Sequence, residues 1–407
     1  MTRRECISRL PVGLALAGVG RSQSKDPMTD YEKRMEAAKI AVAAQRTFGL
    51  HLLREIVDHK PGQNVFISPL SIFLALQMTE NGAAGSTRTA MRKVLALPAG
   101  DAAVSNASAA ALQSALKARD AAALTIANAL WADQHFTLAP AFVKLCESVF
   151  AARAASLNFV DPKAADEINE WVKTNTNGKI PSIVTPDIVK KAAVILTNAV
   201  YFAAKWRSEF AVSETADQVF HKTGGATKTV PMMHQSLLRG AYRSGGNFEG
   251  AILYYKESTV FFTALLPQPG HTPKDVLASL DVEHLSGGPA DFDLDLKLPR
   301  FSLDFSAGLA EYLERMGMAV AFHYPEADFG PMGSKELFIS EVIHKTRLEV
   351  DEKGTVAAAA TAVIMAAGAG MPKPREKKIL VFDRPFVALI GDSQTGAVLF
   401  AGVIEDP

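Results

Sequence analysis

Serine and lysine side chains occur at the spacing of one known kind of acyl-transfer site. Ser114 and Lys117 form an S-x-x-K motif, and Lys222–Gly224 reads K-T-G. In penicillin-recognising enzymes such a serine is acylated, and these two motifs belong to the site. Both motifs are short, and S-x-x-K alone is expected about once or twice by chance in a chain of this size. This enzyme class is therefore only a distant alternative.

Other signatures of catalysis are missing from the sequence. There is no G-x-S-x-G elbow, H-E-x-x-H helix, C-x-x-C pair, phosphate-binding G-x-x-x-x-G-K-[ST] loop or G-x-G-x-x-G motif. The nine histidines are scattered along the chain. We therefore expect no metal, no cofactor and no enzymatic activity.

The two cysteines, Cys6 and Cys146, do not indicate a disulfide framework. Cys146 lies in AFVKLCESVF, whose apolar spacing is typical of a helix. A small buried hydrophobic side chain is a better interpretation of Cys146 than a nucleophile.

Charge and hydropathy argue against nucleic acid and membrane partners. The chain has 43 Lys and Arg against 43 Asp and Glu, without the basic excess that binding to a phosphate backbone requires. The two most apolar stretches are residues 11–20 and 355–371. Neither has the 18 or so strongly apolar residues of a membrane span, because the first is short and the second is mostly Ala and Gly. We expect no membrane-spanning helix.

The first 25 residues have the pattern of an export leader. A basic start with Arg3 and Arg4 precedes an apolar run of small residues and then a polar stretch. The arginine pair resembles a bacterial twin-arginine leader, with cleavage expected after 15–17 (Ala-Leu-Ala). We expect a periplasmic or extracellular protein. The alternative is a disordered cytosolic tail, which would leave the protein in the cytoplasm.

Helical and strand patterns alternate irregularly from residue 30 to residue 407, with no repeat or linker between them. This arrangement predicts one α+β domain over 30–407. Apolar periodicity, capping residues and β-branched content predict the elements. Helices are expected over 31–59, 69–80, from 86 or 87 onward, 102–118, 161–176 and 309–318, and strands over 124–133, 191–202, 259–267, 291–298, 379–391 and 396–404.

Residues 351–371, DEKGTVAAAATAVIMAAGAGM, form an unusual run of small side chains. Alanine favours a helix, but the glycines at both ends and the β-branched residues within the run weaken that default. In an extended chain one face would carry Thr355, Ala357, Ala359, Thr361 and Val363. These side chains are small enough to enter a crowded sheet, so the segment could become a strand.

In its context, this segment resembles the corresponding part of a serpin, and the resemblance extends from about residue 37 to Pro407. The matching motifs occur in the family's order. They include NVFISPLSI (64–72), INEWVKTNTNGKIPSIV (168–184), VILTNAVYFAAKW (194–206), LKLPRFSL (296–303), LFISEVIHKTRLEVDEKGTVAAAATA (337–362) and FDRPFVALI (382–390).

The resemblance implies three β-sheets, about nine helices and an exposed reactive-centre loop over about 354–378. It also implies a monomeric suicide inhibitor of serine proteases. The protease attacks the loop, forms an acyl-enzyme, and is trapped when the cleaved loop inserts into the central sheet. A non-inhibitory serpin that acts as a binding or chaperone-like protein remains an alternative.

The resemblance also assigns a hinge at the start of the loop, where small side chains permit insertion. Val356 replaces a glutamate that many members carry, and its uncharged, β-branched side chain suits a strand. No proline or charge occurs between Thr355 and Thr361 to oppose burial or pairing. The hinge residues are Glu352, Gly354, Thr355, Val356, Ala357, Ala358, Ala359, Ala360 and Thr361.

Two further groups of residues follow from the resemblance. Trp206 and Arg300 match the breach, where the loop enters the sheet, and Arg300 matches the basic partner of the hinge glutamate, Glu352. A cluster of polar side chains, called the shutter, lies under the central sheet where its strands must separate for the loop to insert. These side chains can exchange hydrogen bonds as the sheet opens. The alternative is a satisfied core network with no switching role, which we favour for His344 taken alone. The shutter residues are Ser68, Ser71, Asn198 and His344.

The predicted position of the cleaved bond depends on the residue from which the family's usual spacing is counted. Counting from Glu352 predicts Gly368-Ala369, whereas counting back from Pro385 leads to Pro374, six residues later. We prefer the first count, because insertion length is set from the hinge side. The small residues there favour an elastase-like or subtilisin-like protease as the target. Arg375 keeps a trypsin-like target open.

Overall fold

The computed structural model describes residues 29–117, 123–256, 259–281, 292–355 and 376–407. The predicted leader, residues 356–361 of the hinge, and the predicted reactive bond Gly368-Ala369 lie outside the described residues. Among the described residues, no helix is both long and apolar enough to cross a membrane.

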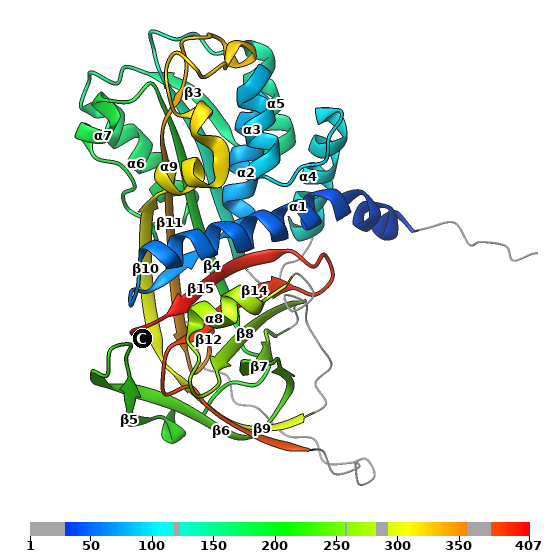
Figure 1. The fold of residues 1–407 in the computed structure, drawn as a ribbon, viewed down its shortest axis with the longest axis vertical. Coiled ribbons are helices and arrows are strands. Elements are labelled where there is room, and N and C mark those ends of the chain that lie inside the picture. Colours follow the sequence, from blue (N-terminus) through cyan, green and yellow to red (C-terminus); the bar gives the residue numbers. More distant parts are fainter. Residues whose placement is uncertain (1–28, 118–122, 257–258, 282–291, 356–375) are drawn as a thin grey trace, which may run out of the picture.

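A six-stranded sheet forms the centre of the molecule (Figure 1). It is mixed: β4 pairs antiparallel with β2 but parallel with β11. In spatial order its strands are β10 (Phe301–Gly308), β11 (Ile339–Asp351), β12 (Gly354–Thr355), β4 (Val194–Lys205), β2 (Ala123–Asp133) and β3 (Arg153–Leu157).

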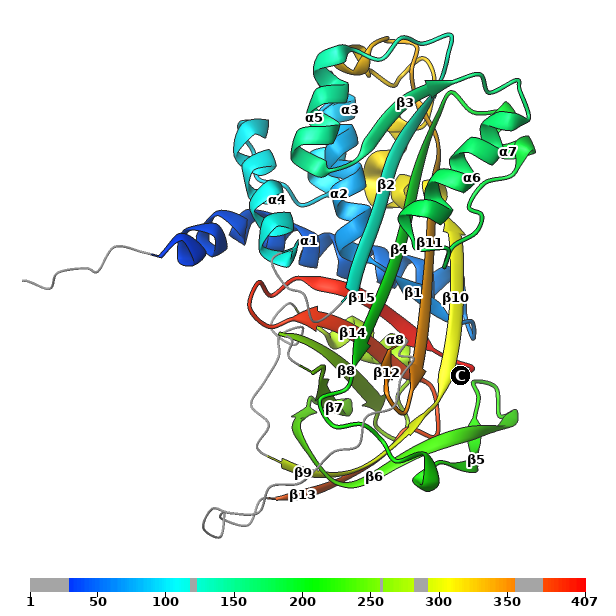
Figure 2. The same cartoon turned by 180° about the vertical axis from the view of Figure 1, so that it is seen from behind.

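A nine-stranded, mainly antiparallel sheet occupies the other half of the molecule (Figure 2). Its long strand β6 pairs with β5 and β9 in its first part and with β7 in its last. The resemblance implies three sheets. Among the described residues, two of these are joined through β6 into the one nine-stranded sheet. The strands are β1 (Val65–Ile67), β15 (Val398–Ile404), β14 (Phe386–Asp392), β8 (Val260–Pro267), β7 (Phe248–Tyr254), β6 (Thr227–Ser244), β9 (Phe292–Pro299) and β13 (Lys377–Val381), with β5 (Ala216–His221) beside β6.

Nine α-helices occur among the described residues, and they cover both faces of the central sheet (Figures 1 and 2). Ile168 and Val172 of α6 pack on one face, against Trp131 and Ile195. The main core lies on the other face, where α2 and α4 pack. The helices are α1 (Asp30–His59), α2 (Pro69–Glu80), α3 (Gly85–Val94), α4 (Ala102–Lys117), α5 (Pro140–Phe150), α6 (Lys163–Asn175), α7 (Pro186–Lys190), α8 (Pro273–Ser279) and α9 (Ala310–Leu313).

Helix α2 shows how local signals define an element of the core. The Ser68 side chain accepts a hydrogen bond from the backbone N–H of Ser71, and Pro69 occupies the first turn, where its missing N–H costs nothing. Every residue of α2 is buried. The predicted start and end of this helix are confirmed.

Two predicted elements differ from the structure. The helix expected over 309–318 is α-helical only from Ala310 to Leu313, and a π-helical turn with a positive φ of 110° at Gly317 follows it. The single strand expected over 379–391 is divided into β13 and β14, which pair with different neighbours. Pro385 lies between them and has no N–H to donate to a sheet ladder.

Candidate functional site

The start of the small-residue segment lies between two strands of the central sheet. In β12, Thr355 pairs with Val350 of β11 on one side and with Ala204 of β4 on the other, antiparallel to both. Farther along the sheet, β11 and β4 pair directly and parallel, from Ile339 and Val194 to Arg347 and Tyr201. The chain thus already enters the sheet at the point where a new strand would separate β11 from β4.

Gly354 is required by the close approach of β12 to β4. Its φ is 156°, and a Cβ atom at this position would lie 2.1 Å from the backbone oxygen of Ala204. Any larger residue would push the chain out of the sheet. The carboxylate of Asp351 holds the preceding turn by accepting hydrogen bonds from the backbone N–H groups of Lys353 and Gly354, at 2.9 and 3.0 Å.

A buried aromatic pair contacts Thr355. The hydroxyl groups of Thr355 and Tyr255 lie 2.7 Å apart, and both residues are fully buried. Tyr255 stacks on Trp206 with ring centroids 4.6 Å apart. Trp206 donates a hydrogen bond from Nε1 to the backbone oxygen of Asp351 at 2.9 Å. Burial raises the pKa of Tyr255, so its hydroxyl stays protonated.

Glu352 is held beside β12 by three partners. Arg300, the partner predicted from the sequence, places Nη1 3.4 Å from Oε1 of Glu352. Thr215 donates its hydroxyl to the same oxygen at 2.8 Å, and the N–H of Phe210 donates to the Glu352 carbonyl at 2.8 Å. Because Arg300 is half exposed, the ion pair contributes about 0 to 1 kcal/mol. Sequence reasoning missed Thr215 and Phe210, which come from a distant segment.

The four shutter residues come together in one buried network. His344 of β11 accepts a hydrogen bond at Nε2 from the backbone N–H of Ser68, at 3.1 Å. The proton of the neutral ring must then be on Nδ1, which donates to Oδ1 of Asn198. Burial lowers the pKa of His344 to about 3, so the ring is neutral at physiological pH. The amide of Asn198 in turn donates to Ser71.

Asn128 of β2 belongs to the same network, although sequence reasoning missed it. It lies opposite Asn198 in the β2–β4 register. Its Oδ1 accepts hydrogen bonds from Asn198 Nδ2 and, at 3.0 Å, from the Ser71 hydroxyl. An asparagine inside the apolar run LTIANALWAD was the available signal, because a buried amide needs partners. Ser68, Ser71, Asn128, Asn198 and His344 are called the polar cluster below.

The residues of the alternative acyl-transfer site are far apart. Ser114 is exposed on α4, whereas Lys222 and Thr223 lie between β5 and β6, in the other half of the molecule (Figure 1). There they contact the last residues of the chain, Asp406 and Glu405. Cys146 is buried as predicted, and burial raises the pKa of its thiol to about 12. A thiol of that kind is a poor nucleophile at neutral pH.

Comparison with known proteins decides the family. A family model described as "Serpin (serine protease inhibitor)" matches residues 43–407. The chain belongs to the serpin family. A serpin-like protein of Thermococcus kodakarensis is 34% identical to this serpin over 393 residues. The alignment covers 95% of this serpin and 90% of the relative. Leukocyte elastase inhibitor of Bos taurus is 33% identical over 386 residues, and the alignment covers 90% of this serpin and 99% of the inhibitor.

Solved serpin structures share the whole fold of this serpin. The native state of the thermophilic serpin tengpin matches with a TM-score of 0.80 at 28% identity, covering 94% of this chain and 96% of tengpin. Human kallistatin matches with a TM-score of 0.79, also at 28% identity, covering 91% and 98%. The predicted family and α+β fold class are therefore confirmed, and the family supports protease inhibition as the general function.

Proposed function

We propose that this serpin is a monomeric suicide inhibitor of serine proteases that needs neither metal nor cofactor. A protease serine attacks the carbonyl of Gly368, releases the amine of Ala369 and remains attached as an acyl-enzyme. The freed loop then enters the central sheet and carries the protease with it. The observation that carries this proposal is β12, which already pairs with both β11 and β4.

The register of β12 supports a loop of matching length. Gly354 lies opposite Lys205, and Thr355 lies opposite Ala204. If the same register continues along β4, Met365 will reach Val194, the first residue of that strand. About ten residues beyond Thr355 would then be inserted. The predicted cleavage after Gly368 comes shortly past this point, whereas Arg375 is much farther along the chain.

The same register gives Thr361 a specific place in the inserted strand. His344 pairs with Asn198 where β11 and β4 are adjacent. Continuing the β12 register along both strands brings Thr361 between these two residues. Insertion must break the hydrogen bond from His344 to Asn198, and the Thr361 hydroxyl can replace it, because it can both donate and accept. We therefore assign the hinge, breach and shutter roles to the residues named from the resemblance.

We propose an elastase-like or subtilisin-like protease as the target. Small residues surround the proposed cleaved bond, Gly368-Ala369, and such residues fit a small specificity pocket. The relatives named leukocyte elastase inhibitor support this choice. A trypsin-like target would instead cut after Arg375.

One experiment tests both the mechanism and the bond. The purified serpin is mixed with an elastase-like protease and, separately, with a trypsin-like protease. We expect a complex with the elastase-like protease that survives a denaturing gel, and a released peptide whose mass corresponds to residues 369–407. Cleavage without a stable complex by both proteases would favour the non-inhibitory alternative. A peptide starting at Glu376 would move the bond to Arg375.

We also propose that residues 1–25 direct export, so that the mature protein is periplasmic or extracellular. The arginine pair supports a twin-arginine route. Expression in a bacterium, followed by fractionation and mass measurement, tests this. We expect a shortened, exported protein, and retention in the cytoplasm when Arg3 and Arg4 are both replaced by lysine. A full-length cytoplasmic protein in the unmodified case would contradict the proposal.

A further inference from the structure

Two asparagine-glycine pairs occur in this chain, and their surroundings differ. They are Asn81-Gly82, at the end of α2, and Asn177-Gly178, just after α6. A glycine after an asparagine leaves the backbone nitrogen between them unhindered, because glycine has no Cβ. That nitrogen can attack the side-chain carbonyl carbon of the asparagine and close a five-membered imide ring. Whether a pair reacts depends on what holds the asparagine side chain and on the access of water.

Asn81 is held firmly by its neighbours. Its amide nitrogen donates to the backbone oxygen of Gln77 at 2.8 Å and to Oδ1 of Asn106 at 3.1 Å. Its own Oδ1 accepts a hydrogen bond from the Asn106 amide at 2.7 Å. Gly82 is buried, and a Cβ atom added to it would lie 2.8 Å from Cβ of Met332. The Asn81 side chain therefore has little freedom to turn toward the Gly82 nitrogen, and water has little access to that nitrogen.

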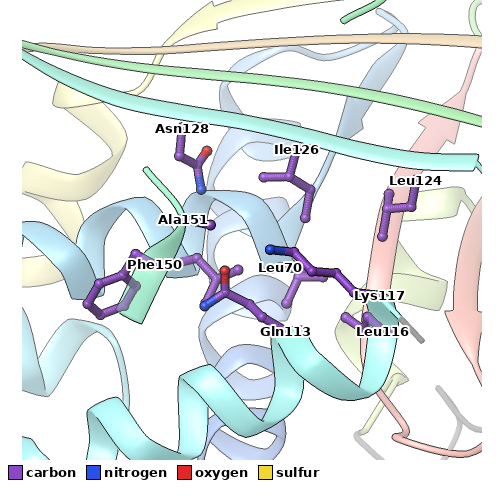
Figure 3. Close-up of a pocket in the computed structure, with 10 residues that line it drawn as sticks. Leu70, Gln113, Leu116, Lys117, Leu124, Ile126, Asn128, Phe150 and Ala151 are labelled. Carbon is purple, nitrogen blue, oxygen red and sulfur yellow. The ribbon is translucent and has the colours of Figure 1, made fainter. Parts of the chain in front are cut away.

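Asn128 of the polar cluster is also held, deep in the interior. Figure 3 shows its side chain directed from β2 toward the helices, and its amide nitrogen donates to the backbone oxygen of Ser71 at 3.3 Å. Its oxygen accepts hydrogen bonds from Ser71 and Asn198. The residue that follows it is Ala129, whose Cβ hinders attack by the backbone nitrogen. A buried and bonded amide of this kind is inert.

Asn177 lacks these restraints. Asn177 and Gly178 are both exposed, and a Cβ atom added to Gly178 would meet nothing within 4 Å. Among the residues that the structure describes, none forms a hydrogen bond with the side-chain amide of Asn177. The N–H of Gly178 donates to the carbonyl of Lys173 at 2.8 Å, so the reaction requires the end of α6 to open. Helix ends open readily, because they fray.

We propose that Asn177 is a site of spontaneous modification, and that its conversion loosens the end of α6. The Gly178 nitrogen loses its proton to a base in the solvent and bonds to Cγ of Asn177, and the side-chain nitrogen leaves as ammonia. Water then opens the imide at either carbonyl, which gives aspartate or isoaspartate without oxidation or reduction. In isoaspartate the main chain runs through the side-chain carbons, and the α-carboxylate becomes the side group. This site is independent of the proposed inhibitory function.

The conversion changes the turn that joins α6 to the central sheet, on the face shown in Figure 2. Isoaspartate lengthens the backbone between Thr176 and Gly178, so the Gly178 N–H no longer reaches the Lys173 carbonyl in the same geometry. The new negative charge lies at the C-terminal end of a helix, where the helix dipole favours cations. In the same turn, Nζ of Lys179 lies 5.5 Å from the ring centroid of Tyr201 in β4. Loosening of this turn therefore weakens the attachment of α6 to β4.

The test ages the native serpin in a mildly alkaline buffer and follows both asparagine-glycine pairs. Peptide mapping by mass spectrometry measures the replacement of the side-chain NH₂ by OH at each pair. Asn177 should convert at least about tenfold faster than Asn81, because local structure protects Asn81. In urea the two rates should become similar, because both pairs are then unfolded. Equal rates in the native protein, or a difference that persists in urea, would overturn the structural basis of the proposal.

Isoaspartate is measured separately, with a protein isoaspartyl methyltransferase and a labelled methyl donor as the probe. Asn177→Ser should remove most of the methyl incorporation from aged protein. Asn175→Ser is the matched control, because Asn175 is also exposed but is followed by Thr176 instead of a glycine. Its methyl incorporation should equal that of the unmodified sequence. Equal incorporation in Asn177→Ser and Asn175→Ser would overturn the site.

Hydrogen exchange tests the effect on α6. The backbone amides of residues 173–180 should exchange at least about threefold faster in aged protein than in fresh protein, and aged Asn177→Ser should show no such change. Asn177→Asp introduces the charge without lengthening the backbone, so its amides should show a smaller increase. Unchanged exchange in a protein whose mass shows full conversion would overturn the loosening of α6 but not the modification site.

Discussion

At the scale of single residues, the contact between Tyr255 and Thr355 holds the start of the loop in the sheet. Each hydroxyl is buried, so removing one leaves the other without a partner. We expect Tyr255→Phe and Thr355→Val each to lower native-state stability by about 1 to 3 kcal/mol. The double variant should lose less than the sum of the two single losses. Denaturant unfolding of the four proteins measures this, and strict additivity would show that the two groups do not interact.

His344 gives a second residue-scale prediction, which concerns pH. Burial lowers its pKa to about 3, whereas an unfolded histidine has a pKa of about 6.5. Between these values the unfolded chain binds a proton that the native protein does not, so stability is lost as pH falls below about 6.5. The loss approaches about 1.4 kcal/mol per pH unit.

The measurement is unfolding between pH 7 and pH 5, above the range where most carboxylates titrate. His344→Gln should be less stable at pH 7 but show a flatter pH dependence. His271→Gln is the control, because His271 is exposed. If the two variants keep equal slopes, another group causes the pH dependence.

At the scale of elements, the site depends on a two-residue strand between two long ones. Thr355→Arg should prevent insertion, because a cationic side chain cannot be buried beside Tyr255 without a partner. We expect the protease still to cleave the loop but to form little stable complex. Lys353→Arg is the control, because it keeps the positive charge at a position two residues away that is only half buried. The Lys353→Arg protein should inhibit the protease normally. Denaturing gels of both variants measure this, and normal complex formation by Thr355→Arg would contradict the insertion register.

At the scale of the whole molecule, the proposed insertion would change the kind of sheet. The native contact between β11 and β4 is parallel, and β12 is antiparallel to both. A strand that continues β12 would replace one parallel ladder by two antiparallel ladders, which are somewhat more stable per residue. About ten added residues would gain hydrogen bonds worth about 1 kcal/mol each, against an entropy cost of about 1 to 2 kcal/mol for ordering each residue. We expect pairing together with burial of the small side chains to outweigh that cost.

The thermal midpoint should therefore rise by at least about 10 °C after cleavage of the loop. Calorimetry of the native and cleaved forms measures this. Cleaved Thr355→Arg should show no such rise, which separates strand insertion from simple relief of loop strain. A cleaved native sequence that melts at or below the uncleaved temperature would show that the loop does not enter the sheet.

Much of this molecule was predictable because its signals are local. The capping of α2 by Ser68, the alternation along 291–298 and the burial of Cys146 depend on side chains within a few residues of one another. The family motifs predicted the fold class and the ion pair between Arg300 and Glu352. The roles of the hinge and shutter residues stay predictions.

Other features were decided only by the tertiary structure. Tyr255 contacts Thr355 across 100 residues, and Asn128 joins Asn198 across 70, so neither partner can be recognised from its own neighbourhood. The division of 379–391 at Pro385 likewise depends on which strands each half meets. Sequence alone predicted helices such as α1, α2 and α4 and strands such as β2, β4 and β8, and it identified a run of side chains small enough for a crowded sheet. The partners of the buried hydroxyl and amide groups were decided by sheet register, because a polar side chain in a strand can bond only to what the neighbouring strands bring opposite it.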